Sequence, residues 1–162
     1  MKQKITTFLT FDGRAEEAVD LYTSVFPNSR VTSKRYYGAA GLGLDGSLMT
    51  ASFELDGQEF SALNGGPSFE FSQGISLFVD CETQEEVDHY WEKLSEGGEQ
   101  GPCGWLTDRF GVSWQIVPRV LREYLSDEDP EKANRVMNAM LQMSKIEIDG
   151  LTRAYESEGA IA

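Results

Sequence analysis

The segment from Gly101 to Pro118 holds the residues with the greatest potential for chemistry. It is a glycine-rich loop that runs into an alternating strand, and it carries a thiol at Cys103, a carboxylate at Asp108 and an amide at Gln115. A cysteine between a proline and a glycine is open to a nucleophilic role, because backbone N–H groups in such a loop stabilise a thiolate. No histidine is placed to activate it, so we favour a structural or incidental thiol.

Two carboxylates are candidates for a general base. Glu59 falls on a predicted strand, and Asp108 precedes the turn at 109–111. Desolvation beside aromatic rings raises the pKa of a carboxyl group toward the range needed for proton transfer at neutral pH. For Asp108 we favour the alternative role of capping the turn that follows it.

A repeated pattern of strands and helices must position these residues. Alternating side chains predict a strand at Ile5–Phe11, and helical spacing follows from Ala15 to Phe26. Three further strands are predicted at 29–37, 48–55 and 58–63, with a flexible loop at 38–46. The last two form a hairpin around Asp56-Gly57, because this dipeptide favours the positive φ angles of tight turns.

The second half of the chain repeats the first. A shift of 68 residues places Leu9 on Leu77. A shift of 54 residues places Ser61 on Gln115. Self-similarity of this kind is typical of duplicated structural units. The sequence therefore predicts an α+β fold with two tandem βαβββ modules.

A helical extension follows the second module. A short helix is predicted at 120–125, and Asp129 before Pro130 is a strong signal for the start of another. A third helical segment is predicted at 146–155, and 157–162 is expected to fray. The expected boundaries are 1–125 for the domain, with modules at 1–68 and 69–118, and 126–162 for the C-terminal extension. The apolar stripe of the extension packs on its own domain, which we favour, or on a second subunit.

Charge and composition narrow the partners. The chain has 14 Lys and Arg against 27 Asp and Glu, a net charge of −13 that repels a phosphate backbone, so neither nucleic acid nor a membrane is an expected partner. No apolar run approaches the ~20 residues of a membrane span, and the N-terminus lacks the apolar segment of a secretory signal. The two cysteines are expected to be reduced thiols in a cytoplasmic protein.

Several motifs carry a family resemblance. They read AEEAVDLY at 15–22, FPNS at 26–29, NGGPSFEF at 64–71, CGWLTDRFGVSWQIVP at 103–118 and RVMNAM at 135–140. Together with two βαβββ modules, they resemble the PhnB-like family of the vicinal oxygen chelate superfamily, which includes glyoxalase I, extradiol dioxygenases and bleomycin-resistance proteins. The resemblance implies a curved mixed sheet with helices outside, an active site in the cup of the sheet, and homodimers. Members often carry the label 3-demethylubiquinone-9 3-methyltransferase, but this sequence lacks a Gly-rich strand-to-helix loop followed by an acidic ribose-binding position.

Strand alternation assigns side chains to this cup. If Leu9 and Val79 pack against the helices, their neighbours in each strand face the cup. The same parity turns Trp114 toward the helices, and Ser113, Gln115 and Val117 toward the cup. The expected ligand-binding residues are Thr6, Phe8, Glu59, Ser61, Ser76, Phe78, Ser113 and Gln115, together with Trp105, which is expected in the preceding loop, where it would close over a ligand.

The resemblance also locates the metal ligands of metal-dependent relatives. Those relatives carry His or Glu on the first and last strand of each module, and the matching positions here are Thr6, Ser61, Gly74 and Gln115. Only Gln115 has a ligating side chain, and one neutral amide oxygen does not hold zinc, nickel or iron against water. The sole histidine, His89, lies on a predicted helix and is expected at the surface. We therefore expect no metal and no cofactor.

Two classes of function remain open. The leading hypothesis is metal-independent binding of a small organic molecule, planar or weakly polar, in the cup. The alternative is an enzyme, either a metal-dependent lyase, isomerase or dioxygenase, or the methyltransferase of the family label. No catalytic residue is assigned, because the sequence offers no evident acid and base pair.

Overall fold

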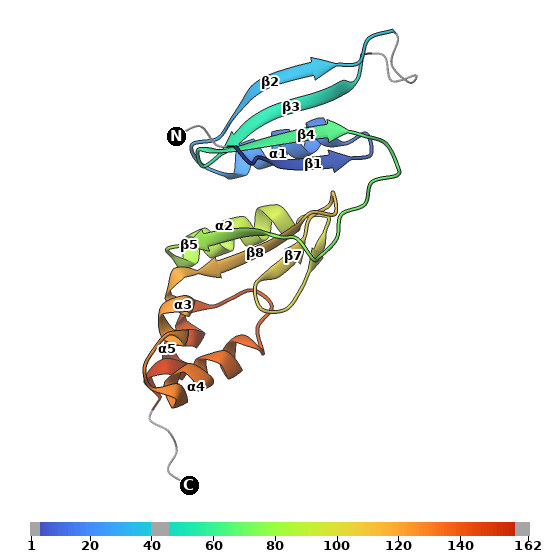
Figure 1. Cartoon of the computed structure of the whole chain (residues 1–162). Coiled ribbons are helices and arrows are strands. Elements are labelled where there is room, and N and C mark those ends of the chain that lie inside the picture. The colour runs from blue at the N-terminus through green and yellow to red at the C-terminus, as the bar shows by residue number, and fades with distance from the viewer. Residues whose placement is uncertain (1–3, 40–45, 158–162) are drawn as a thin grey trace. The chain divides into compact units, whose positions relative to one another are not determined.

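The computed structural model describes residues 4–39 and 46–157 (Figure 1). Most of the loop predicted at 38–46 and most of the end predicted to fray at 157–162 lie outside the described residues. The chain divides into two compact units, Met1–Glu70 and Phe71–Ala162. No helix in the described part of the chain is long and apolar enough to cross a membrane.

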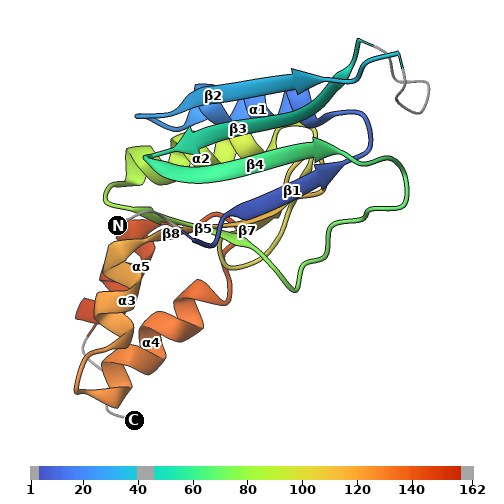
Figure 2. The same ribbon diagram turned by 45° about the horizontal axis from the view of Figure 1, so that its top comes forward.

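The first unit is one four-stranded sheet with a helix on one face (Figure 2). Its elements are β1 (Thr7–Phe11), α1 (Ala15–Val25), β2 (Arg30–Tyr36), β3 (Leu48–Leu55) and β4 (Gln58–Asn64). The strand order is β1-β4-β3-β2, with β1 parallel to β4 and the other pairs antiparallel. The predicted strand, helix and hairpin of this half are confirmed.

The second unit repeats this topology and adds three helices. Its elements are β5 (Leu77–Cys81), α2 (Gln84–Ser95), β6 (Glu99–Gln100), β7 (Trp105–Thr107), β8 (Ser113–Pro118), α3 (Arg119–Leu125), α4 (Pro130–Met140) and α5 (Ile148–Glu156). The strand order β5-β8-β7-β6 matches that of the first sheet, with β5 parallel to β8. The α+β fold of two βαβββ modules followed by helices is therefore confirmed.

Each sheet has one covered face and one open face. In the first unit, Leu9 and Phe11 are buried on the side of α1, whereas Phe8 between them is 56% exposed. In the second, Trp114 and Ile116 of β8 are buried, whereas Phe78 of β5 is 48% exposed. Because side chains alternate across a strand, the open face of each sheet corresponds to the cup face expected from the sequence.

The internal repeat has a different offset in its first strand from the one predicted. Thr7 pairs with Phe60 and Leu77 pairs with Trp114, so Thr7 and Leu77 are equivalent and the offset is two residues longer than the predicted 68. A displacement of two residues keeps every side chain on its face. It moves the equivalent of Thr6 from Gly74, as expected, to Ser76.

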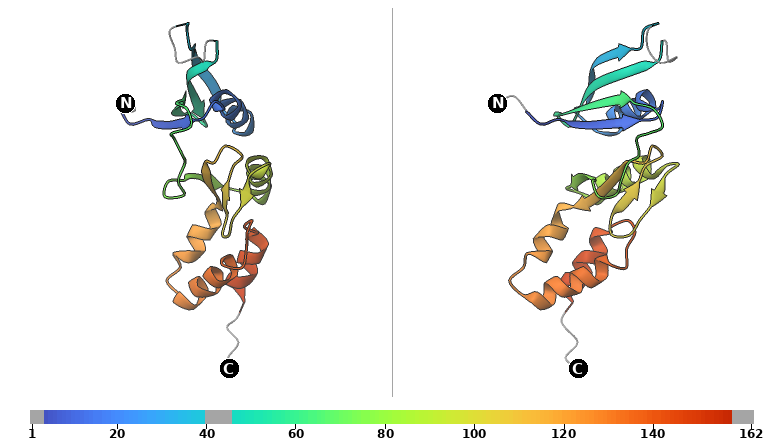
Figure 3. Two further views of the ribbon diagram at one scale, coloured as in Figure 1. Left: turned by 90° about the vertical axis from the view of Figure 1, so that its right-hand side faces the viewer. Right: turned by 45° about the vertical axis from the view of Figure 1, so that its right-hand side comes forward.

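The helices α3, α4 and α5 form a small apolar core of their own against the second sheet (Figure 3). This core contains Val117 at the end of β8 together with Leu121, Val136, Ile146 and Leu151. The sequence assigned Val117 to the open cup. It is instead buried, because the chain turns into α3 directly after Pro118 and the three helices cover the end of the strand.

The predicted start of α4 is confirmed in detail. Pro130 is its first residue, and the carboxylate of Asp129 accepts a hydrogen bond from the backbone N–H of Glu131 at 2.9 Å. A proline fits here because the first helical N–H has no partner inside the helix.

Candidate functional site

One row of side chains on the open face of the second sheet runs across three strands. The strand pairing places Phe78 of β5 opposite Gln115 of β8, and Gln115 opposite Trp105 of β7. The row therefore holds an amide between two aromatic rings. The Nε2 of Gln115 donates a hydrogen bond to the hydroxyl oxygen of Ser76 at 2.8 Å, which fixes the orientation of the amide.

A second row beside it is polar. Ser113 of β8 pairs with Thr107 of β7, and Thr107 pairs with Glu99 of β6. Two hydroxyl groups and a carboxylate thus lie in register on neighbouring strands, parallel to the aromatic and amide row. The two rows give this face both flat apolar surface and hydrogen-bonding groups.

A cavity of about 350 Å³ lies over part of these rows. This volume is in the range of pockets that take small organic molecules. The lining residues are Gln73, Glu99, Gln100, Gly101, Pro102, Trp105, Leu106, Thr107 and Ser113. Of the residues predicted to bind a ligand, Trp105 and Ser113 line the cavity, and Gln115 lies beside both of them in the sheet.

The hydroxyl of Ser113 is the one buried side-chain oxygen or nitrogen without a hydrogen-bond partner in the described part of the chain. Ser113 is only 3% exposed, and it lines the cavity. A buried hydroxyl without a partner is unfavourable by about 1–3 kcal/mol, so such groups are rare and call for a reason. The hydroxyl without a partner thus belongs to a residue at the edge of the cavity.

Asp108 holds the loop that leads into β8. Its Oδ1 accepts hydrogen bonds from the backbone N–H groups of Phe110 and Val112 at 2.8 and 3.0 Å. Its Oδ2 accepts from the indole Nε1 of Trp114 at 2.8 Å. The residue is 3% exposed, and these bonds support the favoured capping role over that of a general base.

The environment of Cys103 does not support a nucleophilic role. The backbone N–H groups of Cys103 and Gly104 both donate to backbone carbonyl oxygens, those of Met143 and Ser144, each at 2.7 Å. They are therefore unavailable to stabilise a thiolate. The second thiol, Cys81, is fully buried, and burial raises its pKa to about 12, which keeps it protonated and unreactive.

The predicted residues of the first unit lie on or next to the open face of its own sheet. Phe8 and Ser61 are neighbours across the parallel pair of β1 and β4. Glu59 of β4 is exposed, and Thr6 is exposed just before β1 begins. Their role in ligand binding stays a prediction.

The sequence missed Thr107, Glu99 and Gln73 in the lining of the cavity. Thr107 shares a face with Trp105 two positions earlier, so strand alternation identifies it once Trp105 is known to lie in a strand. The strands β6 and β7 have only two and three residues, in a segment with many glycines. Such short strands leave little periodic signal.

Metal-binding side chains do not cluster in the region that the structure describes. Within residues 4–39 and 46–157, no group of three His, Cys, Asp or Glu side chains is placed to hold a metal ion. His89 lies on the exposed side of α2, as expected.

Comparisons with known proteins identify the family. The family model described as 3-demethylubiquinone-9 3-methyltransferase matches residues 3–117. A solved structure from Bacillus cereus, described as a putative 3-demethylubiquinone-9 3-methyltransferase and PhnB protein, is 41% identical over 72% of this chain and 99% of its own, with a TM-score of 0.66. No curated protein matches the chain in a sequence comparison.

More distant structures share the fold. A protein from Pseudomonas aeruginosa is 22% identical over 72% of this chain and 98% of its own, with a TM-score of 0.62. The fosfomycin resistance protein FosX from Listeria monocytogenes, crystallised with Mn(II) and sulfate, is 17% identical over 70% of this chain and 89% of its own, with a TM-score of 0.51. The chain belongs to the PhnB-like family labelled 3-demethylubiquinone-9 3-methyltransferase.

Proposed function

We propose that this protein binds a small, uncharged, planar organic molecule in the cavity beside Trp105, without a metal ion. The observation that carries the proposal is Ser113, a residue that lines that cavity and whose buried hydroxyl has no hydrogen-bond partner in the described part of the chain. Ligand pockets typically combine flat apolar walls with a few hydrogen-bonding groups that fix orientation. Trp105 supplies the flat wall, and Ser113 and Thr107 supply the hydroxyl groups.

The charge of the chain supports an uncharged ligand over an anion. The net charge is −13, and the single charged side chain in the cavity lining is the carboxylate of Glu99. An anionic ligand would meet repulsion from both. A carboxylate also accepts hydrogen bonds, so a ligand with an N–H or O–H group has a partner at Glu99 as well as at Ser113.

Binding is favoured over catalysis because the lining lacks a matched acid and base. It contains no histidine, cysteine or lysine beside Glu99. General acid and base catalysis needs groups within hydrogen-bonding reach of the proton that moves. One carboxylate on a two-residue edge strand supplies half of such a pair.

Three probes of similar size and different charge test the proposal, namely neutral benzamide, anionic benzoate and cationic benzylamine. Saturation-transfer NMR on the full chain is expected to detect benzamide, with a weaker or absent signal for benzoate. The Ser113→Ala variant should lose affinity for benzamide, whereas Ser72→Ala, a change outside the cavity lining, should not. Absence of benzamide binding at millimolar concentration, or equal binding to both serine variants, would contradict the proposal.

The alternative is an enzyme of the superfamily. The FosX protein from Listeria monocytogenes was crystallised with Mn(II). Stoichiometric manganese, zinc, nickel or iron in protein purified without chelator would favour this alternative over metal-independent binding. For the methyltransferase of the family label, saturating S-adenosylmethionine should raise the melting temperature, and no shift would exclude it.

We also propose that the protein is a cytoplasmic homodimer. The aromatic side chains of Phe8 and Phe78 on the open sheet faces are about half exposed, and burying them is favourable in water. The negative charge argues against nucleic acid and anionic lipid as partners.

A further inference from the structure

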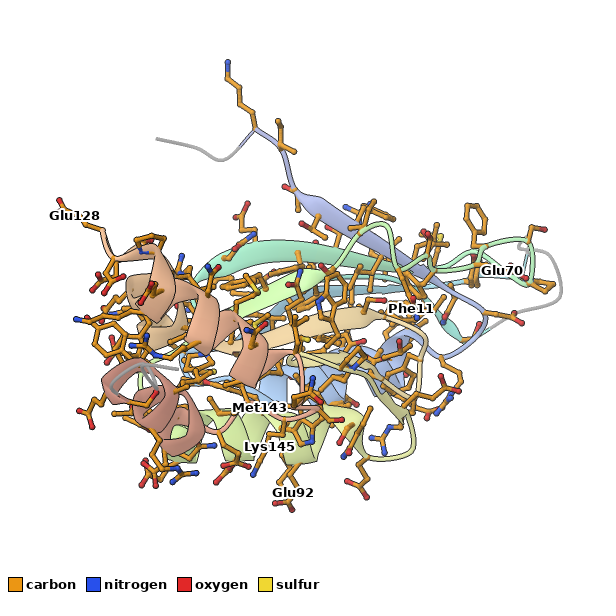
Figure 4. The ribbon with its side chains drawn as sticks, turned by 90° about the horizontal axis from the view of Figure 1, so that it is seen from below. Phe11, Glu70, Glu92, Glu128, Met143 and Lys145 are labelled. Carbon is orange, nitrogen blue, oxygen red and sulfur yellow. The ribbon has the colours of Figure 1, made fainter. Side chains whose placement is uncertain are left out.

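The connection between α4 and α5, residues 141–147, is hydrogen-bonded to the turn that precedes Trp105. The carbonyl oxygens of Met143 and Ser144 accept hydrogen bonds from the backbone N–H groups of Cys103 and Gly104, each at 2.7 Å. Figure 4 labels Met143 and Lys145 in this connection. The connection lies beyond residue 117, where the family match ends.

The backbone of the turn needs this support. Cys103 and Gly104 have φ angles of +56° and +81°, a region that side chains with a Cβ rarely adopt. A Cβ added at Gly104 would lie 2.6 Å from the carbonyl oxygen of Ile116 and 3.0 Å from Cδ1 of Ile146. Gly104 is thus held between β8 on one side and the connection on the other. The strained backbone conformation of Cys103 persists only where its surroundings fix it.

Two side chains anchor the connection to α2. The side chain of Gln84 donates to the carbonyl oxygen of Ile146 at 3.2 Å and accepts from the backbone N–H of Ile148 at 2.7 Å. The ammonium group of Lys145 lies 2.5 Å from a carboxylate oxygen of Asp88. Ile146, between these two anchors, is fully buried.

The opposite side of the same turn is a wall of the cavity. Gly101 and Trp105 are joined by a backbone hydrogen bond of 2.8 Å, and the N–H of Trp105 donates to the carbonyl oxygen of Pro102 at 3.0 Å. All three residues line the cavity. A displacement of the turn at Cys103 and Gly104 therefore moves this wall.

We infer that the α4–α5 connection positions the Trp105 wall and thereby sets the ligand affinity of the cavity. Gln84 and Lys145 act as positioning residues, since Gln84 contacts the connection, Lys145 ties it to Asp88, and neither lines the cavity. The ligand part of this inference rests on the proposed function. The mechanical part of the inference, that the connection holds the turn in place, is independent of the proposed function.

Hydrogen exchange on the full chain tests the mechanical part. In Gln84→Ala and in Lys145→Met, the amides of residues 101–105 are expected to exchange faster than in the wild type. The matched control is Tyr155→Phe, which removes the hydrogen bond from the Tyr155 hydroxyl to Asp127 between α3 and α4 and leaves the hydrogen bonds of Gln84 and the ion pair of Lys145 unchanged. Lys145→Arg should restore slow exchange. Unchanged exchange at 101–105 in both anchor variants, with melting curves still cooperative, overturns the inference.

Benzamide titration tests the ligand part. The two anchor variants should bind benzamide several-fold more weakly than the wild type, and Tyr155→Phe should bind it equally well. Faster exchange with unchanged affinity overturns the link between the wall and the ligand. If the wild type binds none of the three probes, the proposed function fails, while the exchange comparison still decides whether the connection holds the turn.

Discussion

The hydroxyl of Ser113 carries most of the functional information at the scale of single residues. Strand alternation predicted that Ser113 and Gln115 share a face, and the pairing of β7 with β8 places Trp105 on that face as well. The sequence could not show that the Ser113 hydroxyl lacks a hydrogen-bond partner, because this depends on every group that surrounds it in space.

The assignment of Gly74 as the equivalent of Thr6 was wrong by two residues, since a period-two pattern is unchanged by such a shift.

The three hydrogen bonds of Asp108 predict a structural role for this carboxylate. In Asp108→Asn, one carboxylate oxygen becomes an NH2 group that faces an N–H donor, either the indole of Trp114 or the backbone at Phe110 and Val112. The unfolding free energy should fall by about 1–3 kcal/mol in urea denaturation. The exposed control Asp12→Asn should change it by less than about 0.5 kcal/mol. Equal stability of the two variants would contradict this role.

At the scale of elements, the sequence identified the helices and long strands but not β6 and β7. Each helix has a clear signal, such as Asp129 before Pro130 at the start of α4. The two short strands form because β7 pairs with the edge of β8 and β6 pairs in turn with β7, and this is a property of the assembled sheet. The burial of Val117 has a similar origin, since it depends on helices packed from later in the chain.

The close packing around Gly104 predicts a large effect of adding one methyl group. Gly104→Ala adds a clash with Ile116 to the strain of a positive φ angle. Gly13 has a similar φ of +75° with open space around it, so Gly13→Ala measures the backbone strain alone. We expect about 1–2 kcal/mol of destabilisation at Gly13, and more at Gly104. Similar losses at both positions in urea denaturation would show that the packing at Gly104 is loose.

The ion pair between Asp88 and Lys145 predicts a pH dependence for the anchoring of the connection. The Lys145 ammonium holds the pKa of Asp88 below its ordinary value of 3.8, and the Asp88 carboxylate raises the pKa of Lys145 above its ordinary value of 10.5. The lowered carboxyl pKa stabilises the fold above pH 3.8, and this stabilisation is lost as the pH falls through the folded-state value. The raised ammonium pKa stabilises the fold below pH 10.5, and this stabilisation is lost as the pH rises through the folded-state value.

The effect of the pair should be small and confined to a window of pH. Both side chains are partly exposed, so the pair contributes about 1 kcal/mol or less. The difference in unfolding free energy between the wild type and Lys145→Met should be constant near neutral pH and shrink at both extremes. A difference that does not vary with pH would show that the loss in Lys145→Met comes from packing instead.

At the scale of the whole molecule, the internal sequence repeat predicts two modules, and the composition gives a net charge of −13. Two equivalent sheets were predicted from self-similarity, and both are present with the same strand order. Each leaves one face with a half-exposed aromatic side chain, Phe8 or Phe78. A chain of high net charge that keeps such residues at its surface is expected to use them in association.

Association through the sheet faces predicts which substitutions will weaken a dimer. Phe8→Ser and Phe78→Ser should lower the dimer fraction in light scattering at micromolar concentration. Leu141→Ser, directly after α4, changes a side chain that is 54% exposed on the helical extension, and it should leave the dimer intact. A dimer lost only in Leu141→Ser would place the interface on the extension, and a wild-type monomer would contradict the proposed homodimer.

The stability and affinity of Ser113→Ala, measured together, test the central claim most directly. Removing a buried hydroxyl without a partner should leave the free protein as stable as the wild type or up to about 1–3 kcal/mol more stable, a rise of about 2–4 °C in Tm for each kcal/mol. The same variant should bind benzamide more weakly. Gained or equal stability with lost affinity is the result expected for a group kept for a ligand. A destabilised variant with unchanged affinity would show that Ser113 serves the fold and not a ligand.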